Sequence, residues 1–167
     1  MMLPLEESEL RCGLVGFGMI YDETYRPVFE SRASTPFYSP ATGPVRVRLC
    51  AVATRTGTRV SRYQRSYGNR MPPFDSFAGN DAVPQLLSTD LHAVCVATPD
   101  DRHFAVARSA LAAGKHVLIE KPSVLSLAEL DELTRLAAAN RVLAKVVYHK
   151  LSDPDHKKLR TLYQDGV

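Results

Sequence analysis

Apolar strands that alternate with helices are the feature that most constrains how this chain folds. The run 91–97 is almost continuously apolar, as in strands covered on both faces, and Phe104, Ala107 and Leu111 follow it at helical spacing. A strand, a crossover helix and a further strand pair in parallel within one sheet. The sequence therefore predicts the α/β class, with a doubly wound parallel sheet between two layers of helices. This three-layer αβα arrangement is the Rossmann fold.

The predicted elements are separated by clear start and stop signals. Gly114 ends one helix, and Ser126 with Glu129 forms a capping box that begins the next. Residues 32–44 contain three prolines and predict a long loop, whereas the prolines within 72–74 predict extended chain. We expect strands at 10–17, 45–53, 91–97, 116–119 and 142–148, and helices at 20–31, 58–67, 81–87, 101–113, 126–139 and 154–164.

The composition is that of an ordinary globular protein. Of the 167 residues, 45% are hydrophobic and 23% charged, and no apolar run approaches the roughly 18 residues that a membrane helix needs. Cys12, Cys50 and Cys95 lie in apolar, strand-like runs without zinc-ligand spacing. We therefore expect buried, reduced thiols in a cytoplasmic protein, with no metal site and no membrane partner.

The distribution of basic residues favours a phosphate-bearing ligand. The net charge is only +3, and arginines cluster between Arg46 and Arg70. A nucleic-acid surface would need a continuous basic face with interleaved aromatic residues. Only the stretch between Arg46 and Arg70 has some of this character. We therefore expect no nucleic-acid partner. The alternative interpretation of the cluster is a solvated, arginine-rich helix face.

A glycine motif follows the first predicted strand. Gly16 and Gly18 allow close backbone approach next to a helix start, where the pyrophosphate of a dinucleotide would bind. The third glycine of the fingerprint is replaced by Tyr21, so the motif is incomplete. We expect this segment to bind cofactor through Gly16, Phe17, Gly18, Met19 and Ile20.

The end of the second long strand indicates which dinucleotide binds. An acidic residue there would bond the adenosine ribose and repel a 2′-phosphate, but this chain has Thr54 and Arg55 instead. A guanidinium can grip phosphate in a bidentate fork. We expect Thr54 and Arg55 to bind cofactor, with NADP preferred and NAD also open. The alternative is that Arg55 merely faces solvent.

Two further strand ends carry polar residues. The strand His116–Ile119 runs directly into Glu120-Lys121-Pro122, which puts a lysine at the carboxyl edge of the sheet, where ligands bind. Ala97, Thr98 and Pro99 follow the preceding strand, and His103 comes shortly after them. His103 is a candidate to face the cleft, its alternative being a structural histidine.

Taken in order along the chain, these motifs resemble the amino-terminal half of the glucose–fructose oxidoreductase and inositol dehydrogenase (Gfo/Idh/MocA) family. Besides the sites above, the resemblance rests on Ala-Gly-Lys-His-Val before Glu120 and on Tyr148-His149-Lys150 with Asp153-Pro154. It implies an NAD(P)-dependent oxidoreductase that transfers hydride to or from a sugar, a polyol or a related ring alcohol.

The resemblance also implies roles for individual residues. Lys121 would match the family's active-site lysine, which contacts substrate and nicotinamide ribose, and His103 would match the histidine of the neighbouring loop; both are our catalytic candidates. Glu120 and Pro122 would shape the lysine turn, with a cis peptide bond before Pro122. Ala97, Thr98 and Pro99 would border the nicotinamide. We count all of these except His103 as cofactor-binding residues.

The same resemblance predicts the domain organisation. We expect a dinucleotide-binding Rossmann domain at 1–149 and a linker helix at 150–167, leading toward a second, substrate-binding domain that this chain lacks. Asp165 and Gly166 form a turn signal, as in a cut chain. We expect the chain alone to be inactive, and the full-length protein's oligomeric state, including a homo-oligomer, stays open. The competing hypothesis is a non-catalytic dinucleotide-binding or interaction module in which Lys121 is only structural.

Overall fold

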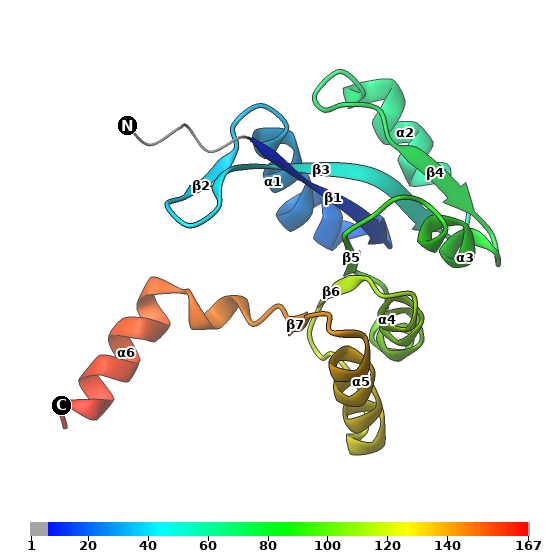
Figure 1. Cartoon of the computed structure of the whole chain (residues 1–167). Coiled ribbons are helices and arrows are strands. Elements are labelled where there is room, and N and C mark those ends of the chain that lie inside the picture. The colour runs from blue at the N-terminus through cyan, green and yellow to red at the C-terminus, as the bar shows by residue number, and fades with distance from the viewer. Residues whose placement is uncertain (1–6, 167) are drawn as a thin grey trace.

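The computed structural model describes residues 7–166 and shows a single, mostly parallel sheet (Figure 1). Its strand order is β2-β3-β1-β5-β6-β7, and β4 pairs with the same edge of β3 as β2 does. The strands are β1 (Ser8–Val15), β2 (Phe37–Ser39), β3 (Gly43–Thr54), β4 (Asp75–Ala78), β5 (Ala93–Val96), β6 (His116–Ile119) and β7 (Ala144–Val146).

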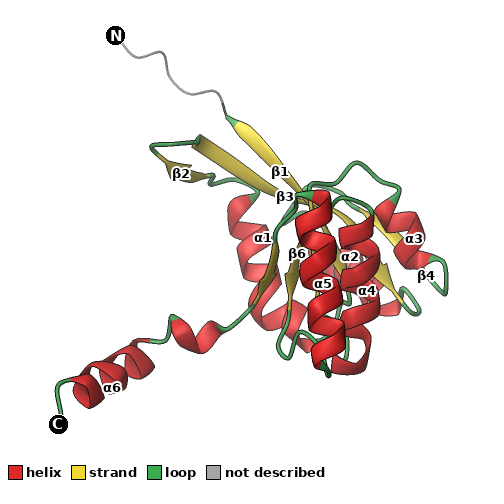
Figure 2. Cartoon of the chain, turned by 60° about the horizontal axis from the view of Figure 1, so that its bottom comes forward, coloured by secondary structure: helices red, strands yellow, loops and turns green. Residues whose placement is uncertain are grey.

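Helices cover both faces of this sheet, as the doubly wound prediction requires (Figure 2). One core contains α3, α4 and α5, which pack on side chains such as Val15 and Val94, and the other contains α1 and α2 on side chains such as Leu14 and Val52. The α/β fold class is thereby confirmed. The helices are α1 (Arg26–Arg32), α2 (Thr58–Tyr67), α3 (Ala82–Leu87), α4 (His103–Ala112), α5 (Leu127–Asn140) and α6 (Pro154–Gln164).

The register brings the strand ends that carry the predicted site to one edge. Val15 pairs with Ala53 and with Val96, and Val96 pairs in turn with Ile119. The residues that follow these four strand ends therefore share the carboxyl edge of the sheet. The chain proceeds outward from β1 to β3 and β4 and then returns to the other side of β1 at β5, so β1 and β5 flank the topological switch point.

Two segments differ from the expected elements. The predicted loop at 32–44 contains β2, which pairs antiparallel with the first residues of β3, from Gly43 to Val45. Its flanking prolines are tolerated because β2 is an edge strand, where a missing N–H faces no partner. The extended chain expected near Phe74 continues into β4, which runs parallel to the end of β3.

The first helical segment also differs in its winding. Residues Tyr21–Tyr25 form a π-helical turn before α1 begins at Arg26. Likewise a 3₁₀ turn, Asp100–Arg102, precedes α4. Both irregular turns lie directly after strand ends at the carboxyl edge, where the chain must change direction within a few residues.

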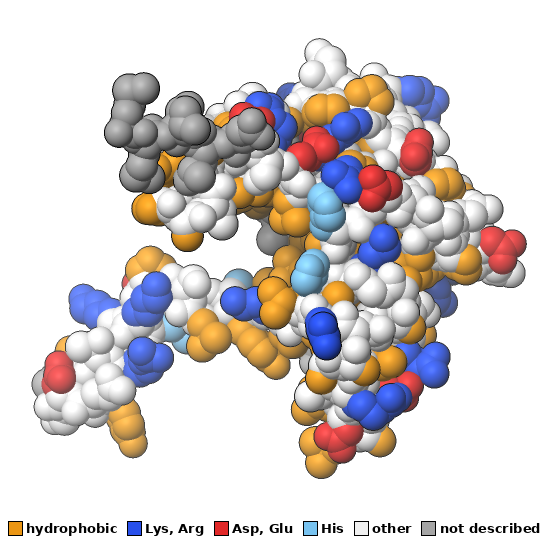
Figure 3. All heavy atoms as spheres, viewed as in Figure 1, with side chains coloured by type: hydrophobic (Ala, Val, Ile, Leu, Met, Phe, Trp, Pro, Cys, Tyr) orange, Lys and Arg blue, Asp and Glu red, His pale blue; other side chains and the backbone are white. Residues whose placement is uncertain are grey.

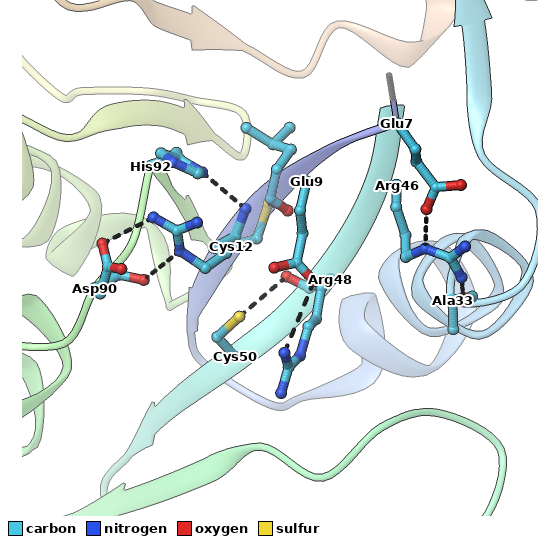
Figure 4. A network of polar contacts seen from close by, with 11 residues as sticks. Glu7, Glu9, Cys12, Ala33, Arg46, Arg48, Cys50, Asp90 and His92 are labelled. Atoms are coloured by element: carbon cyan, nitrogen blue, oxygen red, sulfur yellow. Dashed lines mark hydrogen bonds and ion pairs between the residues drawn. The ribbon is translucent and has the colours of Figure 1, made fainter. Parts of the chain in front are cut away.

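Two arginines of the cluster, Arg46 and Arg48, lie toward the opposite, amino edge of the sheet (Figure 4). Arg46 pairs with Glu7 at 2.5 Å, and Arg48 lies 3.7 Å from Glu9. Farther along, Arg70 lies 3.6 Å from Glu30. These three arginines have carboxylate partners within the chain itself, and for them the link to a phosphate ligand stays a prediction.

Candidate nucleotide-binding site

A cavity of about 690 Å³ opens at the carboxyl edge, on the switch point between β1 and β5. Most of the predicted cofactor-binding residues line it, and no aspartate or glutamate does so within residues 7–166. Its lining includes the predicted residues Gly16, Phe17, Gly18, Thr54, Arg55, Ala97, Thr98 and Pro99.

The glycine turn forms the floor of this cavity. Gly16 has a φ of +97°, donates its N–H to Ala53 O at 2.9 Å, and leaves no room for a Cβ, which would overlap the carbonyl of Ala97. Gly18 is different, because a Cβ there would meet nothing within 4 Å. The protein therefore requires glycine at 16, whereas open space over Gly18 suits the close approach of a ligand.

Tyr21, at the position of the missing third glycine, is part of the core. Its side chain is fully buried and stacks on Phe17 with ring centroids 3.6 Å apart. The edge of Tyr63 on α2 completes this aromatic cluster at 5.7 Å. With a glycine at position 21, helix and sheet would pack closely; here the ring of Tyr21 fills the space between them. The glycine turn therefore keeps its shape without the third glycine.

Arginines give the lining of the cavity a positive charge. Arg55, Arg59 and Arg102 all line it. Arg55 lies in the turn that follows β3. A hydrogen bond from the N–H of Gly57 to Thr54 Oγ1, at 2.9 Å, stabilises this turn. Because the lining carries no aspartate or glutamate among the described residues, the cavity favours an anionic ligand such as a phosphate.

The Glu120-Lys121-Pro122 turn follows β6, next to the cavity. Glu120 is buried, and the hydroxyl of Tyr25 donates to its Oε1 at 3.0 Å. Burial, together with the neighbouring Cys95 and Glu120, raises the pKa of Tyr25, so its hydroxyl keeps its proton for that bond. Lys121 is exposed, and the Lys121–Pro122 peptide bond is cis, as the resemblance implied.

His103 connects the two neighbouring turns. Its side chain is only 1% exposed, with Nε2 at 2.7 Å from Thr98 O and Nδ1 at 2.6 Å from Pro122 O. The sequence left open whether this histidine faces the cleft. In the structure both ring nitrogens are occupied by backbone carbonyls, which favours a positioning role over contact with a ligand.

The structure does not bring all predicted site residues into the cavity lining. Met19 is largely exposed, Ile20 packs on the core, and Glu120, Lys121 and Pro122 lie on the adjoining strand end. Conversely, the sequence analysis missed several lining residues, chiefly Arg59, Asn80 and Arg102. The Gly79-Asn80 turn could have been found, because a turn dipeptide after an extended segment marks a strand end.

Within residues 7–166, no group of histidine, cysteine, aspartate and glutamate side chains has the arrangement of a metal site. In the same part of the chain, every helix is too short or too polar to span a bilayer.

Comparison with known proteins agrees with this geometry. Residues 10–148 match the model of the Gfo/Idh/MocA oxidoreductase family, described by its NAD-binding Rossmann fold. The chain is 28% identical to the uncharacterized oxidoreductase YdgJ of Escherichia coli, over 96% of this chain and 40% of that protein. It is 26% identical to dTDP-3,4-didehydro-2,6-dideoxy-alpha-D-glucose 3-reductase of Actinomadura kijaniata, over 98% of this chain and 44% of the relative.

A solved structure shows the same fold with a dinucleotide bound. KijD10, a 3-ketoreductase from Actinomadura kijaniata in complex with TDP-benzene and NADP, superposes with a TM-score of 0.74 at 26% identity, over 95% of this chain and 44% of that one. The chain thus spans less than half the length of these relatives. With its glycine turn, its switch-point cavity and its family match, the chain belongs to the Gfo/Idh/MocA oxidoreductases as their nucleotide-binding Rossmann domain.

Proposed function

We propose that this chain binds NADP in preference to NAD, as the cofactor-binding portion of an oxidoreductase acting on a sugar, a polyol or a related ring alcohol. The observation that carries the proposal is the switch-point cavity, whose lining holds the glycine turn and three arginines and, within residues 7–166, no aspartate or glutamate. Support comes from KijD10, solved with NADP, and from the relative named for reduction of a dTDP-sugar. The bound cofactor supplies the hydride chemistry, and the protein orients it.

We assign each part of the dinucleotide to the residues that line the corresponding part of the cavity. The backbone of Gly16, Phe17 and Gly18 would hold the pyrophosphate, whereas Thr54 and Arg55 would hold the 2′-phosphate. Thr98 and Pro99 lie at the end of β5, on the side toward Lys121, and would border the nicotinamide. In this assignment Met19 and Ile20 contribute little, since neither lines the cavity.

Lys121 would act on substrate as a charged hydrogen-bond donor to the reacting hydroxyl. Lys121 is exposed after β6, the strand next to β5, and the neighbouring Glu120 accepts a hydrogen bond from Tyr25 in the interior. His103 would hold the lysine turn against the Thr98 turn. In the protein with its substrate domain, Lys121→Ala is expected to abolish turnover while NADPH still binds; retention of turnover would contradict this role.

The domain assignment follows from the same comparison. We propose residues 1–149 as the dinucleotide-binding domain and 150–167 as a linker helix toward a substrate domain. The family match covers 10–148, and in Figures 1 and 2 α6 extends away from the sheet. Lys121 does not line the cavity, so this chain does not form a complete substrate site by itself. We therefore expect the chain alone to turn over no sugar or polyol.

Calorimetric titration with NADPH and with NADH tests the cofactor assignment. One good charge-assisted contact to the 2′-phosphate contributes about 1.5–3 kcal/mol, so NADPH should bind about 10- to 150-fold more tightly than NADH. Arg55→Ala should remove most of that difference and leave NADH binding unchanged. An NADH preference that persists in Arg55→Ala would contradict the assignment.

A further inference from the structure

An ion pair joins two helical segments that begin next to the proposed cofactor cavity. Arg59, in the first turn of α2, contacts Asp22 Oδ2 through Nη2, and Asp22 lies in the π-helical turn just after Gly18. Arg59 itself lines the cavity, whereas Asp22 does not. The pair therefore spans from the pyrophosphate side of the cavity to its adenosine side.

Among the arginines that line the cavity, Arg59 alone has a carboxylate partner within the described residues. The side chains of Arg59 and Asp22 are 59% and 43% exposed, respectively. Exposed ion pairs contribute little to stability because water screens them and ordering two long side chains costs entropy. A phosphate dianion binds a guanidinium more strongly than one exposed carboxylate does, since it carries more charge.

We propose that Asp22 sets the selectivity between NADP and NAD. Its carboxylate holds Arg59 until the 2′-phosphate of NADP replaces the carboxylate as the partner of Arg59. The inference rests on the proposed function and adds to it a residue from the opposite side of the cavity. When NADP binds, Arg59 exchanges the carboxylate for the phosphate, and Asp22 remains nearby as a free negative charge. Both the lost ion pair and the remaining charge oppose NADP binding, whereas NAD leaves the pair intact.

Calorimetry with NADPH and NADH on four variants tests this exchange. We expect Arg59→Ala to weaken NADPH binding about 10-fold and NADH binding less than about 2-fold. Asp22→Asn should strengthen NADPH binding about 3- to 5-fold, because the isosteric amide neither holds Arg59 by charge nor repels phosphate. In the Arg59→Ala background the gain from Asp22→Asn should be smaller, because only the repulsion of phosphate by Asp22 is then removed. Arg62→Ala, on the exposed side of the same helix, is the matched control for loss of one charge.

Each contrary result has a distinct meaning. If the unmodified chain binds neither dinucleotide, the proposed function fails before selectivity can be asked. Equal weakening of NADPH and NADH by Arg59→Ala would place Arg59 on the shared part of the dinucleotide and overturn the proposal. So would weaker NADPH binding in Asp22→Asn, or a gain from Asp22→Asn that is just as large without Arg59, since neither requires an exchange of partners.

Discussion

Gly16 and Gly18 are equivalent in the sequence motif, but the structure gives each a different reason to lack a side chain. Gly16 has a positive φ, and a Cβ there would overlap the carbonyl of Ala97. Gly18 has neither restriction within the protein. The first glycine is therefore a requirement of folding, whereas the fold itself leaves room for a side chain at the second.

This difference predicts opposite effects of the two alanine substitutions. Gly16→Ala should lower the free energy of unfolding by about 2–4 kcal/mol, through left-handed strain and the backbone overlap. Gly18→Ala should change it by less than about 0.5 kcal/mol, yet weaken binding of NADPH and NADH alike. Urea unfolding and calorimetry on the same preparations measure both quantities. Full dinucleotide affinity in Gly18→Ala would argue against a pyrophosphate at this turn.

Tyr21 shows why the glycine motif could be interpreted only in part from the sequence. From the sequence, a bulky residue in place of the third glycine counted against the glycine turn. In the structure the ring stacks on Phe17 and is enclosed by Tyr63, a contact between residues far apart in the chain. Compensation of this kind depends on tertiary packing, which local spacing does not reveal.

At the scale of elements, His103 joins the turns that follow β5 and β6. Its ring nitrogens lie at hydrogen-bond distance from Thr98 O and Pro122 O, and the side chain is buried. Replacement by alanine removes both contacts and leaves a cavity between the two turns. We expect His103→Ala to cost about 2–4 kcal/mol of stability.

A positioning role makes a further prediction that a purely structural one does not. His103→Ala should weaken NADPH binding, and His103→Gln should restore part of the affinity, because its amide can donate to one of the carbonyls. The exposed His149 provides the control, and His149→Ala should change neither quantity. Equal affinities for NADPH in His103→Ala, His103→Gln and the unmodified chain would show that the histidine does not position the cofactor site.

The strand ends could be predicted from the sequence, and so could the residues that directly follow them. Thr54, Arg55, Thr98 and Pro99 line the cavity because parallel strands in register end at one edge. Arg59 and Arg102 were missed because they lie a helical turn further on, where facing direction depends on how the turn is wound. The strand β2 was missed because its flanking prolines are also typical of loops.

At the scale of the whole molecule, α6 stands apart from the domain that holds the cavity. Figure 3 shows it extending from the body with hydrophobic side chains at its surface. Leu159 and Tyr163 are 67% and 83% exposed, and no residue of α6 is buried. The Rossmann domain therefore gains little from this helix, whereas α5 contributes the buried Leu133 to the core.

An isolated helix of this length is marginal in water, because nucleation is costly and few hydrogen bonds repay it. We therefore expect the amides of α6 to exchange with solvent first, and those of β1 and β5 to exchange last. Deleting residues 153–167 should leave the melting temperature within about 2 °C and NADPH affinity unchanged. Leu133→Ala, by contrast, should cost about 2–4 kcal/mol. Protection of α6 equal to that of β5, or a large loss of stability on deletion, would show that the helix packs on the domain in solution.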